Sequence, residues 1–453
     1  MTTQEVLISQ REFFNTGATF DVDFRLTQLK KLKQSVFDNL DEVVAAFKQD
    51  YNKCEFDVIA TELGLVLKEL NYFLKHLRSL ARPKRVGTSL INFPSKGKII
   101  SQPLGAVLIV SPWNYPFQLT LMPIVGAIAG GNTMVVKPSS KTPAVSAAIK
   151  KIMSVFDQNY AYVNCHKDEE LFDLDFDFMF YTGSASFAKT VREKQAKHLI
   201  PCVLELGGKS PCIVDCDADI EIAAKRIAWG KFLNGGQTCV APDYVVVHKD
   251  VKTQFVDRLL FYIKKFYYTG DALNDQYPYV ISQSKVDEIA ELIKGEKILC
   301  GGKAEGRKMH PTVLDDITFD SPIMREEIFA PVLPILTFDK LTDLLNRLKT
   351  MDKPLAFYYY SQSGAACDYV AKNAISGGAC INDCIMHLTE EKLPFGGVGL
   401  SGTGSYHGKK SYDTFVHYRS VLYKNSKEMN IKYPPYTQSK LDFLKSYFKI
   451  PKK

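Results

Sequence analysis

From Pro103 onward, short unbroken apolar runs alternate with segments of helical character, and this alternation constrains the fold more than any other feature. Strands inside a parallel sheet are buried on both faces, so they read as continuous apolar runs. Their alternation with helices predicts an α/β fold with parallel sheets. The first runs are AVLIV at 106–110, TMVVKP at 133–138, FDFMFYTG at 176–183 and SPCIVD at 210–215.

After about Gly207 the alternation starts again, which predicts a second α/β unit joined to the first near residue 206. Its expected elements are a helix at 252–266 and strands at 244–248, 331–338, 355–361 and 378–383. The first 80 residues are predicted to be helical, because an apolar stripe recurs at three- and four-residue steps from Leu26 to Phe47. A second helical run is expected from about Thr61 to Leu80, and short strands outside the core are expected at 87–102.

Composition excludes several classes of protein. A chain of 453 residues that is 46% hydrophobic has ample material for more than one core. A net charge of +7 is too dilute to mark a nucleic-acid binder. Ten scattered cysteines indicate reduced thiols, and the N-terminus has no apolar signal segment. Because no apolar stretch approaches the roughly 20 residues that a spanning helix needs, we expect a cytoplasmic protein without a membrane span.

The segment NGGQTCVAP at 234–242 holds a candidate nucleophile. Small residues before Cys239 let a substrate approach the backbone closely, and a thiol there attacks an electrophilic carbon once its proton is removed. A buried structural cysteine is the alternative for any single cysteine, so the surrounding motifs have to decide between the two.

Two further segments supply that context. In LELGGKSP at 204–211, Glu205 is a carboxylate in an apolar run, where a raised pKa suits a general base; an ion-paired or helix-capping glutamate is the alternative. In SPWNYPF at 111–117, directly after a predicted strand, Asn114 presents an amide donor at the carboxyl end of the sheet. Ligands bind at that end of open α/β sheets.

These segments resemble the aldehyde dehydrogenase superfamily, and the resemblance extends from about Phe24 to Tyr436. The motifs occur in the family's order: PWN at 112–114, GNTMVVKP at 131–138, FYTGS at 180–184, LELGGKSP at 204–211, GQTC at 236–239, EEIFAP at 326–331 and PFGGVGLSG at 394–402. The interval from Glu205 to Cys239 (239 minus 205, or 34) also matches. The stretches NGGQTCVAPDYV, INDCIMHLT, GSYHGKKSYDTF and KYPPYT are similar to the class 3 branch, which acts on fatty and aromatic aldehydes.

The resemblance implies a domain organisation and an assembly. An atypical Rossmann cofactor domain would comprise residues 1–82 and 103–206, and a catalytic α/β domain residues 207–400. Residues 83–102 and about 405–430 would form a small oligomerisation element that completes the sheet of a partner in a homodimer. Residues 431–453 would form a basic C-terminal tail.

The resemblance also implies NAD(P)-dependent oxidation of aldehydes to carboxylic acids, with medium- or long-chain aliphatic or aromatic aldehydes as substrates. Cys239 would attack the carbonyl to give a thiohemiacetal, and Asn114 with the Cys239 backbone N–H would form the oxyanion hole. Hydride transfer to the nicotinamide would leave a thioester. Water activated by Glu205 would then hydrolyse that thioester.

Similarity to the family further assigns cofactor-binding residues, by position in the matched motifs. The pocket, ribose and pyrophosphate contacts would come from Trp113, Lys137, Ser140, Gly183, Ser184, Leu206, Glu327 and Phe329. The sequence departs from the family's pattern at Ala188 and Ala330, where the family usually has glycine.

A third departure is Ser140, where the family often has a glutamate that binds the adenosine ribose. A neutral residue between Lys137 and Lys141 removes a charge that repels a 2′-phosphate, which predicts that NADP is used at least as well as NAD.

Other interpretations remain open from the residues alone. The C-x3-C pairs Cys212/Cys216 and Cys380/Cys384 have no accompanying histidine pattern, so we expect buried thiols and no metal site. The basic tail is expected to be a solvated helix, with contact to an acidic membrane surface as the alternative. Three other functions compete with aldehyde oxidation to an acid: a non-catalytic binding protein, a coenzyme-A-acylating dehydrogenase, and a thioesterase or esterase without a dinucleotide groove.

Overall fold

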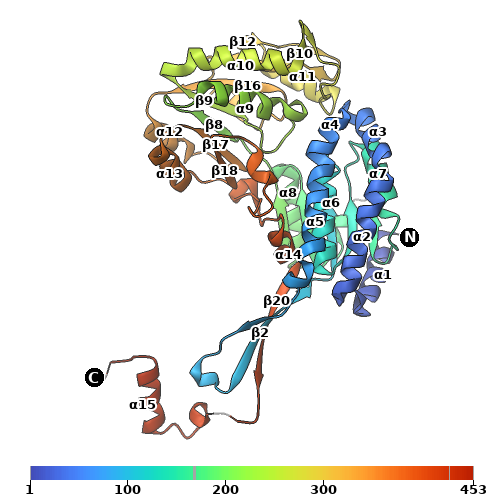
Figure 1. Cartoon of the computed structure of the whole chain (residues 1–453), viewed down its shortest axis with the longest axis vertical. Helices are drawn as coiled ribbons and strands as arrows, with labels where there is room; N and C mark the ends of the chain where they lie inside the picture. Colours follow the sequence, from blue (N-terminus) through green and yellow to red (C-terminus); the bar gives the residue numbers. More distant parts are fainter. Residues whose placement is uncertain (1, 167–169, 428, 452–453) are drawn as a thin grey trace.

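A computed structural model describes residues 2–166, 170–427 and 429–451. Figure 1 shows two α/β units that lie against each other and an arm that projects from them. Each unit is built on its own sheet of mainly parallel strands. The predicted α/β class with parallel sheets is confirmed.

The first sheet has the strand order β19-β7-β6-β3-β4-β5. All of its neighbours pair in parallel except β19, which comes from far along the chain and runs antiparallel to β7. The apolar run at 106–110 forms a wholly buried central strand, as its composition predicts. The bounds are β3 Ala106–Val110, β4 Thr133–Lys137, β5 Ala161–Val163, β6 Phe178–Thr182, β7 Cys202–Glu205 and β19 Gly402–Thr403.

Helices pack on both faces of this sheet (Figure 1). The predicted stripe on α2 is buried at Leu26, Leu29, Leu32 and Val36. Helix α6 is buried along its whole length, as expected of a helix that is apolar all round. The helices are α1 Thr3–Asn15, α2 Val22–Asp38, α3 Leu40–Tyr51, α4 Glu55–Val58, α5 Gly64–Leu80, α6 Gln118–Gly130, α7 Pro143–Met153 and α8 Ala185–Ala196.

One turn of this helical layer is unusual. The helix expected from about Thr61 begins earlier, at Glu55, and residues Ile59–Leu63 between α4 and α5 form a π-helical turn. A Cβ atom on Gly64 would lie 2.8 Å from the carbonyl oxygen of Ile59, so glycine accommodates the wide turn there. Apolar periodicity does not reveal a single inserted residue, which is why the sequence did not predict this turn.

The second sheet has the order β12-β15-β16-β9-β8-β17-β18, and only β12 is antiparallel. Its strands are β8 Pro211–Val214, β9 Tyr244–His248, β12 Lys297–Cys300, β15 Thr312–Asp315, β16 Val332–Phe338, β17 Ala356–Tyr360 and β18 Gly378–Ile381. Its helices are α9 Ile220–Phe232, α10 Lys252–Tyr267, α11 Gln283–Leu292, α12 Leu341–Leu348 and α13 Gly364–Asn373. Short hairpins pair β10 Tyr268–Thr269 with β11 Ala272–Leu273, and β13 Ala304–Glu305 with β14 Lys308–Met309.

The arm is an antiparallel sheet of three strands, β1 Lys84–Val86, β2 Ser95–Pro103 and β20 Val416–Lys424. Helix α14 Lys409–Thr414 joins it to the first unit, and α15 Gln438–Tyr447 lies beyond its far end (Figure 1). No residue of α15 is buried. The tail residues Lys452 and Lys453 lie outside the described residues. Within the described part of the chain, no helix has the length and apolar character needed to cross a bilayer.

Candidate active site

A cavity of about 800 Å³ opens between the two units. Its walls include the residues at the carboxyl ends of β3, β6 and β7, from Val110 to Ser111, Thr182 to Gly183 and Glu205 to Leu206. This is the end of a parallel sheet at which α/β proteins bind ligands. The second unit contributes Cys239, Glu327 and Phe329 to the same cavity.

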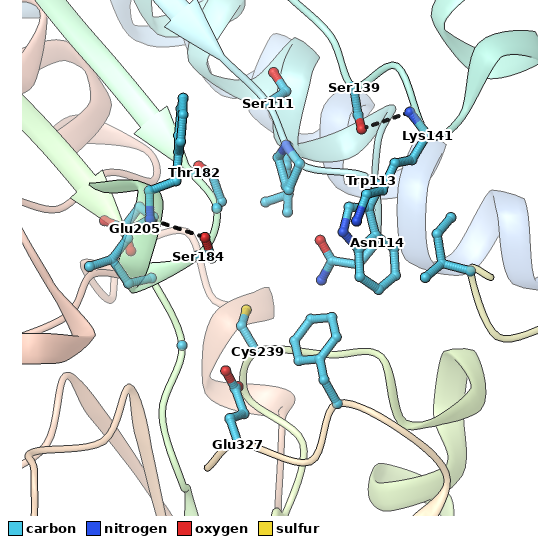
Figure 2. Close-up of a pocket in the computed structure, with 18 of the residues that line it drawn as sticks. Ser111, Trp113, Asn114, Ser139, Lys141, Thr182, Ser184, Glu205, Cys239 and Glu327 are labelled. Carbon is cyan, nitrogen blue, oxygen red and sulfur yellow. Dashed lines mark hydrogen bonds between the residues drawn. The ribbon is translucent and has the colours of Figure 1, made fainter. Parts of the chain in front are cut away.

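Asn114 lies in the loop between β3 and α6. The loop starts where the Ser111 N–H donates to the carbonyl of Lys137, 3.0 Å away, and so continues the β3–β4 ladder. The side chain of Asn114 is 4% exposed, and its Nδ2 donates to the carbonyl of Gln237 at 3.2 Å. Figure 2 shows the amide directed across the cavity toward Cys239. Asn114 therefore holds a fixed N–H donor beside the sulfur.

Cys239 follows a tight turn that only small residues permit. Asn234, Gly235 and Gly236 have φ values of 54°, 64° and 73°. A Cβ atom on Gly236 would lie 2.3 Å from the carbonyl oxygen of Ala330. The half-buried thiol faces the cavity (Figure 2). Burial, followed by the charges of Glu327 and Glu205, raises the pKa of Cys239 to about 12, so the thiol needs a proton acceptor to react near neutral pH.

Glu205 ends β7 and is 2% exposed. Neither of its carboxyl oxygens has a hydrogen-bond partner among the residues that the structure describes. Burial raises the pKa of Glu205 well above its usual value. Buried polar groups are nearly always satisfied, so an unpartnered carboxyl in a cavity wall points to a chemical role.

The carboxyl of Glu327 lies next to Cys239 on the wall that the second unit supplies (Figure 2). A Cβ atom on Gly207 would lie 2.2 Å from its Oε2, so the carboxyl packs directly against the Gly207 backbone. Burial and the charge of Asp243 raise the pKa of Glu327 to about 8. The rings of Trp113 and Phe329 meet edge to face nearby, with centroids 5.4 Å apart.

The rest of the cavity fits a dinucleotide. The N-terminus of α8 faces it, with Ser184 as the N-cap residue and Gly183 beside it. Exposed backbone N–H groups at a helix N-terminus bind phosphate groups. A Cβ atom on Gly183 would lie 2.3 Å from the hydroxyl of Tyr181, so the chain there has no room for a side chain. Trp113, Leu206 and Phe329 supply apolar walls for flat rings.

The structure brings together most of the residues that the sequence singled out. The cavity is lined by Cys239, Glu205, Asn114, Trp113, Gly183, Ser184, Leu206, Glu327 and Phe329. Lys137 and Ser140 are not among its lining residues; Lys137 ends β4, and Ser140 is exposed in the following turn. The departures Ala188 and Ala330 are 3% and 0% exposed, each within an apolar cluster.

Several lining residues were missed by the sequence reasoning. Ser139 and Lys141, on either side of Ser140, line the cavity; the sequence pointed to Lys141 only as a nearby cation, and its Nζ lies 5.7 Å from the ring centroid of Trp113. Their place directly after a predicted strand was the signal available. Ile281, Ser282 and Lys285 at the start of α11 also line it. Nothing in their local sequence marks them, because only the fold brings α11 to the cavity.

The chain is similar in sequence to enzymes of one family. The model of the aldehyde dehydrogenase family matches residues 5–421. The chain is 40% identical to 4,4′-diaponeurosporen-aldehyde dehydrogenase of Staphylococcus aureus, over 98% of this chain and 99% of that one. It is 39% identical to aldehyde dehydrogenase family 3 member A2 of Mus musculus, over 96% and 92%. It is also 39% identical to "Aldehyde dehydrogenase, dimeric NADP-preferring" of Rattus norvegicus, over 94% and 96%.

A solved structure matches the whole fold. The structure titled "Substrate bound state of Staphylococcus Aureus AldH" superposes with a TM-score of 0.96 at 40% identity, covering 99% of this chain and 100% of that one. The arm and both α/β units therefore have counterparts in that protein.

Proposed function

Since the chain belongs to the aldehyde dehydrogenase family and oxidises aldehydes to carboxylic acids with NAD(P), we propose that Cys239, Asn114 and Glu205 carry out this reaction. Cys239 is the nucleophile. Its Sγ, after passing its proton to a carboxylate of the cavity, attacks the aldehyde carbonyl, and the carbonyl oxygen takes up the negative charge. Asn114 Nδ2 and the Cys239 backbone N–H donate hydrogen bonds to that oxygen, which stabilises the thiohemiacetal.

Cofactor binding is assigned to the remaining lining residues. The N-terminus of α8 with Gly183 and Ser184 would hold the pyrophosphate, and Glu327 would hold the nicotinamide ribose. Bound in this part of the cavity, NAD or NADP would supply the acceptor for the hydride of the aldehyde carbon. Lys137 and Ser140 remain proposed ribose contacts, supported by the position of their neighbours Ser139 and Lys141 in the cavity wall.

Glu205 completes the cycle by hydrolysis. A carboxylate at this position accepts a proton from water, and the resulting hydroxide attacks the thioester and releases the acid. The single observation that carries the proposal is the buried carboxyl of Glu205, which has no hydrogen-bond partner in the described part of the chain and shares the cavity with Cys239 and Asn114. A coenzyme-A-acylating enzyme has no use for such a base, and a binding protein has no use for the trio.

The test is the variant Cys239→Ala. We expect aldehyde oxidation to fall by several powers of ten, because the covalent route is lost, while cofactor binding measured by fluorescence persists. Cys300→Ala is the matched control, since Cys300 is a half-buried thiol with a raised pKa outside the cavity. Turnover of Cys239→Ala above about one per cent of the control would assign the nucleophile to another residue.

Finer properties belong to the same proposal. We propose that residues 1–82 with 103–206 bind the cofactor, that 207–400 carry the nucleophile, and that 83–102 with about 405–430 serve oligomerisation. We further propose a cytoplasmic homodimer that acts on medium- or long-chain aliphatic or aromatic aldehydes and uses NADP at least as well as NAD. The name of the relative from Rattus norvegicus, "Aldehyde dehydrogenase, dimeric NADP-preferring", supports the dimer and the use of NADP.

A further inference from the structure

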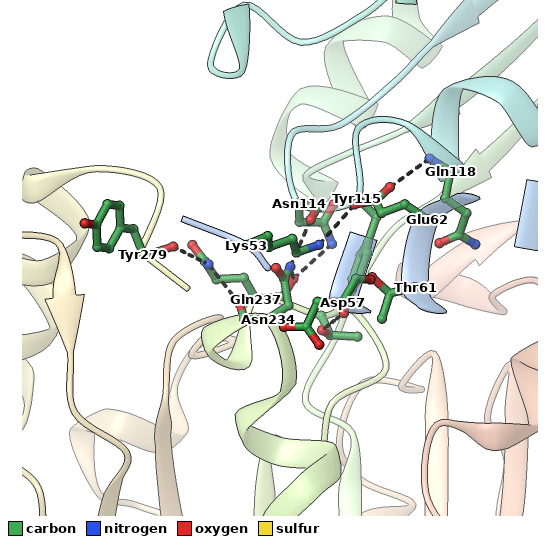
Figure 3. Close-up of polar contacts among 11 residues, drawn as sticks. Lys53, Asp57, Thr61, Glu62, Asn114, Tyr115, Gln118, Asn234, Gln237 and Tyr279 are labelled. Atoms are coloured by element: carbon green, nitrogen blue, oxygen red, sulfur yellow. Dashed lines mark hydrogen bonds and ion pairs between the residues drawn. The ribbon is translucent and has the colours of Figure 1, made fainter. Parts of the chain in front are cut away.

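Next to the cavity, the first unit contains a buried ion pair that the reaction does not use directly. Lys53 Nζ lies 3.1 Å from Glu62 Oε1, and the two side chains are 1% and 0% exposed (Figure 3). Removing two charges from water is unfavourable, so such a pair persists where further hydrogen bonds hold both partners. The additional contacts of this pair lead toward Asn114 and Cys239.

Glu62 fixes the start of α6. Its second oxygen, Oε2, accepts from the backbone N–H of Gln118 at 2.8 Å. Gln118 is the first residue of α6, and the N-cap residue Phe117 makes no side-chain capping bond. A carboxylate at a helix N-terminus satisfies free N–H groups and interacts favourably with the helix dipole. Glu62 thus caps, from another helix, the element that begins directly after the Asn114 loop.

The π-helical turn gives Glu62 its position. Glu62 lies within the turn Ile59–Leu63, where the extra residue rotates the chain relative to a regular α-helix. The turn depends on Gly64, as described above. The wide turn therefore allows the Glu62 carboxylate to reach the N-terminus of α6.

Lys53 acts on the same loop through an aromatic ring. Its Nζ lies 4.6 Å from the ring centroid of Tyr115, the residue after Asn114. The Tyr115 hydroxyl is hydrogen-bonded at 2.6 Å to Oγ1 of Thr238, the residue that precedes Cys239 in the sequence. Tyr115 is thereby held at its ring by the ammonium and at its hydroxyl by the nucleophile loop.

The Asn114 loop and the nucleophile loop are also joined directly (Figure 3). Asn234 Nδ2 donates to the backbone carbonyl of Asn114 at 2.9 Å. Gln237 Nε2 donates to the carbonyls of Asn234 and Tyr279, at 2.9 and 3.0 Å. The distance between the proposed oxyanion donor and the sulfur is therefore set by one continuous network, and the ion pair lies at its far end.

We propose that Lys53 and Glu62 are positioning residues, which hold the amide of Asn114 in register with Cys239 in the reacting state. The inference rests on the proposed role of Asn114. Loss of the pair moves the loop, weakens transition-state stabilisation and leaves aldehyde binding almost unchanged. A displacement of about 1 Å in an active site lowers the rate by up to about 100-fold.

The experiment compares Lys53→Met, Glu62→Gln and the double variant Lys53→Met/Glu62→Leu. Each single change leaves one buried charge without its counter-charge and lowers Tm. The double change removes both charges and restores Tm part of the way, since the Gln118 N–H also loses its acceptor. We expect kcat of the double variant to stay at least about tenfold low with KM for aldehyde nearly unchanged. A kcat that recovers together with Tm would show a purely structural role and overturn the inference.

Controls separate this inference from the proposed function. Asp50→Asn is the matched control, because Asp50 is a buried carboxylate that accepts from the Val145 N–H at 3.0 Å at the start of α7. We expect the Tm of this variant to fall and its kcat to stay unchanged. If the double variant does not fold, Lys53→Met removes the ammonium beside the Tyr115 ring and leaves the cap on Gln118, and an unchanged kcat there overturns the inference. Asn114→Ala tests the premise: if it is fully active, the proposed function fails, whereas an inactive Asn114→Ala with a fully active double variant contradicts only the positioning role.

Discussion

The buried carboxyl groups of this protein differ sharply in how they are satisfied. Glu62, Glu69 and Asp50 each accept a hydrogen bond from a backbone N–H at the start of another helix. Glu205 has no such donor among the described residues. The first three therefore stabilise the fold. The burial of Glu205 destabilises its charged form, and no hydrogen bond to a described residue compensates for this cost.

Glu205→Gln should separate the two halves of the reaction. The amide has the same shape but cannot accept a proton from water, so the thioester should form and then persist. We expect one burst of reduced cofactor per active site, followed by a steady-state rate that is lower by several powers of ten. Stopped-flow absorbance at about 340 nm measures both phases. A steady-state rate equal to that of the wild type would remove Glu205 from the mechanism.

The pH profile follows from the same raised pKa values. Glu327 has a pKa raised to about 8, and that of Glu205 is raised well above its usual value, so both carboxyls are protonated on the acid side of these values. A base works only when ionised, so kcat should rise with pH as Glu205 ionises, well above the range of an ordinary carboxyl group. Steady-state kinetics across this range check the sign. In Glu205→Gln the residual rate should lose the rise contributed by Glu205, and a profile that falls with pH would contradict the assignment.

At the scale of elements, the apolar runs predicted the central strands because burial on both faces leaves a strong compositional mark. Strand β7 was not predicted, because it is short and ends in Glu205 before two glycines. The motifs predicted Cys239, Asn114 and Glu205 as candidates. The motifs did not point to Lys53 and Glu62. The contact of Glu62 with the first residue of α6 depends on a π-helical turn and on tertiary packing, which no local motif reveals.

The turn after β4 controls the choice of cofactor in our proposal. Ser140 is exposed there, between the lining residues Ser139 and Lys141. Ser140→Glu should lower kcat/KM for NADP by roughly tenfold and leave NAD use nearly unchanged, because a carboxylate repels the 2′-phosphate. Thr350→Glu, in the exposed turn after α12, changes the net charge by the same amount and is the matched control. Equal losses with both cofactors, or a wild type that prefers NAD tenfold, would remove Ser140 from cofactor selection.

At the scale of the whole molecule, two edge strands of the described chain bear on assembly. Strand β18 ends the seven-stranded sheet, and β20 ends the sheet of the arm. Apolar side chains on β20 are exposed, among them Tyr418, Leu422 and Tyr423 at 42%, 49% and 45%. Long open edges with exposed apolar residues are liable to associate, and pairing with a second copy removes them.

We therefore expect light scattering to give twice the 51.0 kDa mass of one chain. Leu422→Asp should shift the mass toward that of a monomer, because it places a charge on the proposed contact surface. Ile8→Asp, an equally exposed position on α1 at 53%, should leave the mass unchanged. A wild-type protein that is monomeric and fully active would contradict the dimer.

The antiparallel strand β19 also has a consequence for the order in which the molecule is made. Its two residues complete the first sheet at the edge of β7: Gly402 pairs with Glu205, and Thr403 pairs with Leu204. On a ribosome, domains fold as units from the N-terminus onward. In this protein the edge of β7 stays unpaired until β19, which lies close to the C-terminus, has been synthesised. The wall that carries Glu205 is therefore closed only when most of the polypeptide has been translated, so a truncated nascent chain cannot build a finished active site.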